Sequence, residues 1–226
     1  MSENVQQRWK VDPTLYSCET TRDGYQTKKM MDYESTYVNE FLNKDPMRDW
    51  ESFDRCRALW FWGLRKAGLD HIADVTKFNV LDCGTKDGQF PEFLDGIVDE
   101  VLGIELSMPY VEFANERNRP VVYGDVCKLT DWFDWRDHFD FVFSHHLLGL
   151  TPDYLGALEE MLAVTKKNGY MITCNDVPGN PKKHFSYIET SKIFDEFVSN
   201  SDVSVIHNDR WHPDFAKEWV LFVQKN

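Results

Sequence analysis

From residue 78 onward, short runs of apolar residues alternate with stretches of helical character. The predicted strands are Asn79–Cys83, Val101–Glu105, Val121–Gly124, Phe139–Ser144 and Tyr170–Cys174. Helical stretches lie between several of them, notably at 89–98, 108–118 and 153–166. Short apolar strands that alternate with helices are typical of a parallel sheet covered on both faces, and right-handed crossovers leave few topologies for it.

The end of the chain has a different pattern. Val203–His207 and Trp219–Val223 read as strands joined by a loop without a helix, which predicts an antiparallel pair. We therefore expect an α/β fold: a doubly wound, mostly parallel seven-stranded sheet with an antiparallel C-terminal hairpin and additional N-terminal helices.

Two helices are predicted before the sheet, over residues 31–44 and 47–68, from aromatic and aliphatic residues at roughly helical spacing. A length of 226 residues suits one domain with an appended segment. We expect residues 1–45 to form an N-terminal arm and helix, a candidate lid, and residues 46–226 to form the Rossmann-like domain.

The loop after the first predicted strand carries the main motif. Asp82 ends the strand, and Gly84 and Gly88 follow before a helix begins near Gln89. Glycines permit a tight turn and a close approach of a ligand to the backbone. A third glycine in the dinucleotide pattern is missing, and no phosphate-binding Gly-Lys-Ser/Thr is present in the loop. An acidic residue here suits a ligand with a cationic amino acid end.

Two more carboxylates follow strands. Glu105 ends the second strand and can accept hydrogen bonds from a ribose diol. Asp125 follows the third strand and can accept from an adenine amino group, with the Val126 N–H beside it. Together with Asp82, these groups could contact an amino acid, a ribose and an adenine.

This ordered series resembles the class I S-adenosylmethionine-dependent methyltransferases over about residues 70–226. The fourth motif of that family is matched from Phe139 to Leu148, and the terminal hairpin matches its reversed last strand. The resemblance implies S-adenosylmethionine as cofactor, with S-adenosylhomocysteine as product. The cofactor-binding residues that it implies are Asp82, Gly84, Thr85, Lys86, Gly88, Glu105, Leu106, Asp125, Val126 and Ser144. The sequence departs from the family at Thr85-Lys86-Asp87, where a further glycine is common.

Methyl transfer from a sulfonium is an in-line displacement, which needs mainly an aligned and dry acceptor. A general base is required only if the acceptor must lose a proton. The candidate catalytic residues are His145, His146 and Asp176, with His184 as a further candidate base. Because His145 and His146 are adjacent, extended backbone would point them in opposite directions. No spacing of histidine, cysteine and carboxylate residues predicts a metal.

The acceptor is predicted to be a small molecule. The net charge of −13 disfavours a nucleic acid partner, whose phosphates attract basic surfaces. The fourth motif reads Ser144-His145-His146-Leu147 and lacks the Asn/Asp-Pro-Pro-aromatic and Pro-Cys motifs of base-modifying relatives. The acceptor pocket is expected between residues 1–45 and the loop 175–188, both rich in aromatic residues.

The five cysteines include no Cys-x-x-Cys pair, which favours a reducing compartment. No signal peptide or membrane-spanning run is apparent, so we expect a cytoplasmic protein of undetermined oligomeric state with no membrane partner. Two alternatives remain open: a non-catalytic binding or assembly module of the same fold, and a nicotinamide-dependent enzyme, which the missing third glycine disfavours.

Overall fold

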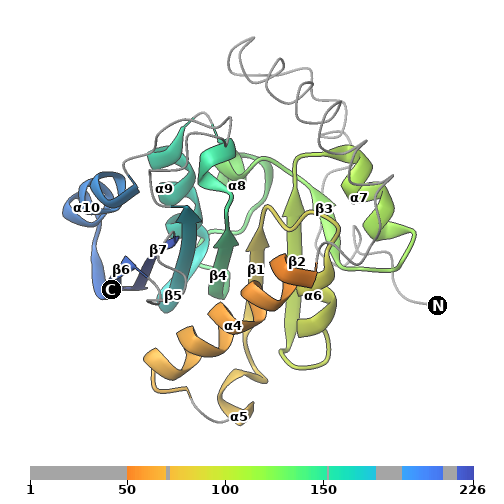
Figure 1. The fold of residues 1–226 in the computed structure, drawn as a ribbon, viewed down its shortest axis with the longest axis horizontal. Coiled ribbons are helices and arrows are strands. Elements are labelled where there is room, and N and C mark those ends of the chain that lie inside the picture. The colour runs from red at the N-terminus through yellow and green to blue at the C-terminus, as the bar shows by residue number, and fades with distance from the viewer. Residues whose placement is uncertain (1–49, 70–71, 152, 177–189, 211–217) are drawn as a thin grey trace.

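A computed structural model describes residues 50–69, 72–151, 153–176, 190–210 and 218–226. Within these ranges a single seven-stranded sheet forms the centre of the molecule, in the order β3-β2-β1-β4-β5-β7-β6 (Figure 1). The strands are β1 (Asn79–Cys83), β2 (Glu100–Glu105), β3 (Val121–Tyr123), β4 (Phe139–His145), β5 (Thr165–Asp176), β6 (Val203–Arg210) and β7 (Glu218–Lys225).

The first five strands are parallel to one another, whereas β7 pairs antiparallel with both β5 and β6. The chain runs from β1 outward to β3, then returns to β4 on the other side of β1. This reversal of strand order lies between β1 and β4, and in open α/β sheets the ligand crevice forms at such a point.

Helices cover both faces of the sheet (Figure 1). The α-helices are α4 (Trp50–Lys66), α5 (Ile72–Val75), α6 (Gln89–Leu94), α7 (Met108–Asn115), α8 (Leu129–Trp132), α9 (Tyr154–Val164) and α10 (Thr190–Asn200). Two short 3-10 turns, η4 (Val126–Lys128) and η5 (Leu148–Leu150), complete the elements of the described residues.

Alternating strand residues separate the two layers of the core. Val80 and Phe141 belong to the cluster that α4, α5 and α6 bury on one face. Leu81 and Val142 belong to the cluster that α8, α9 and α10 bury on the other. The period of two along each strand thus sends neighbouring apolar residues to opposite helical layers, and the parallel part of the sheet is buried on both faces as predicted.

All seven predicted strands and their mixed orientation are confirmed, with end shifts that are largest in β5, which begins at Thr165 rather than Tyr170. The predicted helix 89–98 ends at Leu94, because Asp95 leaves the helical conformation with φ −60° and ψ 119°, and Gly96 follows with a left-handed φ of 87°. The predicted helix 47–68 is α4, and the prediction for residues 31–44 lies outside the described residues. Helices α5, α8 and α10 were not predicted.

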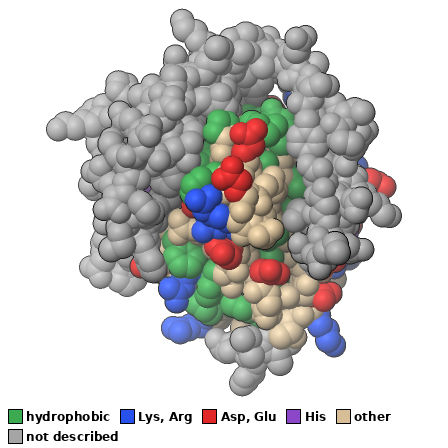
Figure 2. Space-filling view, turned by 90° about the vertical axis from the view of Figure 1, so that its right-hand side faces the viewer, with side chains coloured by type: hydrophobic (Ala, Val, Ile, Leu, Met, Phe, Trp, Pro, Cys, Tyr) green, Lys and Arg blue, Asp and Glu red, His purple; other side chains and the backbone are tan. Residues whose placement is uncertain are grey.

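No helix among the described residues is both long and apolar enough to cross a membrane. Figure 2 shows the side of the molecule on which α7 and β3 lie, where acidic and basic side chains meet in the middle of the described surface.

Candidate functional site

The loop between β1 and α6 is held in a shape that ordinary residues rarely adopt. Gly84 and Gly88 have φ values of 74° and 78°, and Lys86 has φ 54° between them. All three lie in the left-handed region, which glycine enters without steric cost. A Cβ added to Gly84 would lie 2.7 Å from Leu147 Cδ1, so the loop also packs closely against the segment after β4.

Arg119 fixes the end of this loop. Its Nη1 donates to both the carbonyl and the carboxylate of Asp87, at 2.8 and 2.9 Å, and its Nε donates to Glu92 at 2.7 Å. Asp87 and Arg119 are 8% and 14% exposed, so this ion pair is partly shielded from solvent. The charge of Asp87, which departs from the family pattern, is therefore balanced by a neighbour within the protein.

Glu105 joins the loop to β2. Its Oε2 accepts from the Lys86 N–H and its Oε1 accepts from the Ser107 N–H, each at 2.9 Å. Burial raises the pKa of Glu105, opposed by these backbone hydrogen bonds. A carboxylate offers about four lone-pair positions, so Glu105 retains acceptor capacity while it organises the loop.

Asp82 is a buried carboxylate at the end of β1, only 4% exposed. Desolvation raises its pKa from 3.8 to about 7; the Thr85 hydroxyl lowers it and the charge of Glu105 raises it further. Within the described ranges no ion pair neutralises Asp82. A cationic ligand group in this position would favour its ionised form, because an opposite charge at close range offsets desolvation.

The remaining predicted cofactor residues lie along the same edge of the sheet. Asp125 is buried and caps η4 by accepting from the Cys127 N–H at 2.9 Å, which places Val126 at the start of that turn. Leu106 directly follows β2. Ser144 is fully buried and donates to Thr173 Oγ1 at 2.7 Å, so its hydroxyl bridges β4 and β5.

A hollow of about 410 Å³, solvent space included, opens at this edge. It brings together the predicted residues Asp82, Gly84, Thr85, Lys86 and His145. The residues that line it are Phe53, Cys56, Asp82, Gly84, Thr85, Lys86, Asp87, Gln89, Phe90 and His145. Phe53 and Cys56 come from α4 and were missed in the sequence, where the stripe of α4 reads as core.

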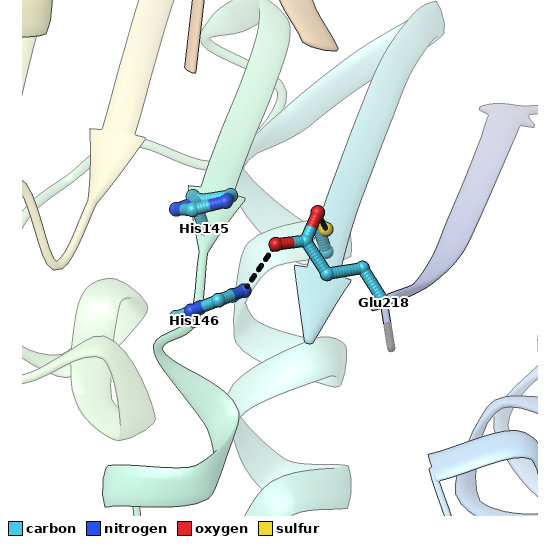
Figure 3. A group of neighbouring side chains, drawn as sticks. His145, His146 and Glu218 are labelled. Carbon is cyan, nitrogen blue, oxygen red and sulfur yellow. Dashed lines mark hydrogen bonds and ion pairs between the residues drawn. The ribbon is translucent and has the colours of Figure 1, made fainter. Parts of the chain in front are cut away.

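The two adjacent histidines do not point apart as predicted. Their rings stack with centroids 4.0 Å apart and planes at 11° (Figure 3). The prediction assumed extended backbone, but His146 has φ 56°, which turns its side chain back beside His145. His145 lines the hollow, and His146 lies behind it.

A second group of polar side chains surrounds His146. Its Nε2 lies 3.2 Å from Glu218 Oε1, and Arg55 Nη1 donates to the same oxygen at 2.9 Å. The Cys174 thiol donates to Glu218 Oε2 at 3.7 Å. Glu218 is 2% exposed at the start of β7. The sequence predicted no metal; in the structure the end of β4 and the residue after it, β5 and β7 bring four side chains of metal-ligand type together. Spacing along the chain cannot reveal such a group.

Asp176 is the last residue of β5, opposite Glu218 in the β5–β7 register. Its side chain, like His184 and the predicted acceptor-pocket segment 1–45, lies outside the part of the chain that the structure describes.

Comparison with known proteins agrees with this geometry. A family model described as "Methyltransferase domain" matches residues 81–173, while no curated protein matches the sequence. The chain resembles the class I S-adenosylmethionine-dependent methyltransferases. That resemblance covers the motif region in sequence and the seven-stranded sheet in fold.

Several solved structures share the fold at low identity. A SAM-dependent methyltransferase from Aquifex aeolicus is 18% identical, with a TM-score of 0.55 over 81% of this chain and 100% of its own. Magnesium protoporphyrin IX methyltransferase from Synechocystis, with bound SAM, is 14% identical, with a TM-score of 0.61 over 92% and 100%. The N-methyltransferase NodS from Bradyrhizobium japonicum, in complex with S-adenosylhomocysteine, is 13% identical, with a TM-score of 0.60 over 88% and 98%.

Proposed function

We propose that this protein transfers the methyl group of S-adenosylmethionine to a small-molecule acceptor. The observation that carries the proposal is Asp82: a buried carboxylate with a raised pKa, at the hollow beside the glycine loop and without a described cationic partner. The amino group of the cofactor would supply the missing cation. This placement follows from a sheet whose strand order reverses between β1 and β4.

The other proposed cofactor contacts follow the edge of the sheet. Glu105 would accept from the ribose hydroxyls with the lone pairs that its two backbone hydrogen bonds leave. Asp125 and the Val126 N–H would meet the adenine. The bound cofactor supplies an activated methyl group, and these side chains hold it in position.

We propose His145 as the residue that contacts the acceptor, since it is the candidate that lines the hollow. His146 would act through it, because the stacked rings restrict each other and Glu218 lies beside His146. Asp176 remains a proposed catalytic residue at the end of β5.

Two observations support a small acceptor. One structural neighbour is described as a magnesium protoporphyrin IX methyltransferase and another as an N-methyltransferase. The net charge of this chain is −13, which disfavours a nucleic acid acceptor. A cytoplasmic location is proposed from the cysteine usage.

Thermal unfolding in the presence of S-adenosylmethionine, S-adenosylhomocysteine or NAD tests the cofactor. A ligand that binds only the native state raises the melting temperature by mass action. We expect both sulfur ligands to raise it and NAD to leave it unchanged. Asp82→Ala and Glu105→Ala should each weaken binding, whereas Glu196→Ala, an exposed change on α10, should not.

No shift with either sulfur ligand at millimolar concentration would contradict the proposal. Unchanged affinity in both site variants would mean that the cofactor binds elsewhere. Formation of S-adenosylhomocysteine from S-adenosylmethionine with a panel of small acceptors then separates an enzyme from the alternative, a non-catalytic binding module of the same fold.

A further inference from the structure

Four side chains that can bind a metal meet behind the hollow. His145 is the last residue of β4 and His146 follows it, Cys174 lies in β5 and Glu218 is the first residue of β7. Figure 3 shows both histidines and Glu218 close together. Each offers one ligand atom, and these atoms all lie within 4.8 Å of one another. We propose that they bind a single divalent transition-metal ion, and that the ion is Zn²⁺.

The choice of zinc follows from the ligand types. Imidazole nitrogen, thiolate sulfur and carboxylate oxygen are the groups that zinc takes in proteins, in tetrahedral sites. Magnesium and calcium select oxygen ligands instead, and two histidines with a cysteine would suit neither.

The distances also suit a tetrahedral ion. Zinc bonds of about 2.0–2.3 Å place neighbouring ligand atoms roughly 3.3–3.8 Å apart. His146 Nε2 lies 3.2 Å from Glu218 Oε1, and Cys174 Sγ lies 3.7 Å from Glu218 Oε2. The widest separation in the group is at most 4.8 Å, so closure by about 1 Å together with rotation of one imidazole out of the stack would complete the site.

Burial and charge favour an ion here. Cys174 is fully buried and Glu218 is 2% exposed. A Cys174 thiolate and the Glu218 carboxylate carry two negative charges and the Arg55 guanidinium one positive charge, so the group has a net charge of −1 that attracts a cation. Zinc binding releases the Cys174 proton to solvent, because the thiolate is the ligand.

Arg55 would support the site from outside. Its Nη1 donates to Glu218 Oε1 at 2.9 Å and leaves the carboxylate with further lone pairs. Metal-binding carboxylates are commonly held by such a second hydrogen bond. The left-handed φ of His146 brings both imidazoles to one side of the chain. Their rings stack with planes at 11°, so one ring must rotate out of the stack before both nitrogen lone pairs can point at a single ion.

A zinc ion with four protein ligands would fasten the segment after β4 to β5 and β7. Histidine binds a metal through one ring nitrogen, so the other nitrogen of His145 would remain for the hollow. The proposal therefore adds a structural ion behind the proposed acceptor contact. It depends on no cofactor or methyl transfer, and its test uses neither.

The test is metal content and cobalt spectroscopy on the full chain without a histidine tag. After equilibration with Zn²⁺ and removal of the excess, we expect about one zinc per chain by elemental analysis. The Co²⁺ form should show intense visible bands of tetrahedral cobalt and a thiolate charge-transfer band in the near ultraviolet.

Variants assign the ligands. Cys174→Ser should remove the thiolate band. Loss of an outer-shell partner alone typically costs 10–100-fold in metal affinity, so each ligand variant, Cys174→Ser, Glu218→Gln or His146→Gln, should weaken zinc retention by at least about tenfold. Cys127→Ser and His207→Gln, which change the same residue types outside the group, should match the unaltered protein. Circular dichroism of each variant distinguishes a lost ligand from a lost fold.

Substoichiometric zinc in the folded, unaltered protein would overturn the proposal. A cobalt spectrum that lacks the thiolate band, or that Cys127→Ser removes while Cys174→Ser does not, would do the same.

Discussion

Lys86 occupies a backbone conformation that costs an ordinary residue free energy. Its φ of 54° lies in the left-handed region, within the segment Thr85-Lys86-Asp87 where the sequence departs from the family pattern. The penalty there for a side chain is about 1–2 kcal/mol. The protein retains the turn because the Lys86 N–H donates to Glu105 and the glycines on either side complete the loop.

Lys86→Gly should therefore leave the free energy of unfolding unchanged or raise it by up to about 1 kcal/mol, after the entropy cost of glycine. Lys86→Val should lower it by at least about 1 kcal/mol, because β-branched residues are outliers at positive φ. Lys192→Gly inside α10 is the control, with an expected loss of about 1 kcal/mol. Urea unfolding measures the free energy of unfolding of all three variants. Equal losses for Lys86→Gly and Lys192→Gly would contradict backbone strain at Lys86.

Asp82 provides a prediction about pH. Its folded pKa of about 7 exceeds the ordinary value of 3.8. The folded protein therefore binds this proton more tightly than the unfolded chain, and stability falls as pH rises from about 4 to about 7. Asp82→Asn should remove this contribution, which differential scanning calorimetry at several pH values would detect as a flatter profile.

The same carboxylate should couple pH to cofactor affinity. If its ionised form binds the ammonium group of S-adenosylhomocysteine, affinity should rise with pH through about 7 and level off above it. Calorimetric titration from about pH 6 to about pH 8 measures this, with Asp82→Asn as the control of flat dependence. Equal pH dependence in both proteins would exclude Asp82 as the titrating group.

At the scale of elements, the glycine loop and β3 fit closely. A Cβ on Gly88 would lie 2.5 Å from Val121 Cγ2, whereas a Cβ on Gly68 would meet nothing within 4 Å. Both glycines have positive φ, 78° and 73°. Substitutions at these two glycines therefore separate the free-energy cost of backbone strain from the cost of steric overlap with β3.

Gly68→Ala should lower the free energy of unfolding by about 1 kcal/mol, from strain alone. Gly88→Ala should lower it by a further 1–3 kcal/mol or so, because β3 must shift to admit the methyl group. Chemical denaturation measures the difference. Equal losses would show that the loop and β3 can separate at no cost, and would weaken the view that the loop is preorganised for a ligand.

Elements were predictable where one physical pattern decided them. The parallel strands and β7 follow from apolar runs that a sheet buried on both faces requires, whereas the edge strand β6 has no buried residue. Helix α10 carried a signal that was overlooked, since Ile193, Phe194 and Phe197 have helical spacing. The stacked histidines were predicted wrongly because the alternation rule fails at a left-handed residue. The group around Glu218 could not be predicted, because its members meet only after β7 inserts beside β5.

At the scale of the whole molecule, the predicted domain boundary after residue 45 can be tested with a fragment that lacks residues 1–45. The buried hydrophobic residues of the described part of the chain begin at Leu59, on α4. A fragment of residues 46–226 therefore contains every described core residue and each proposed cofactor contact. We expect it to form the same sheet and to bind S-adenosylhomocysteine within about threefold of the full chain, a difference below about 0.7 kcal/mol.

Methyl transfer should nevertheless be lost or strongly reduced in that fragment. Residues 1–45 are proposed to cover the acceptor, and a reaction that needs an aligned and dry acceptor suffers when its cover is removed. Cofactor titration and turnover, measured on the same samples, separate the two steps. A large loss of cofactor affinity would assign part of the cofactor site to residues 1–45, and unchanged turnover would show that the acceptor is held by the Rossmann-like domain alone.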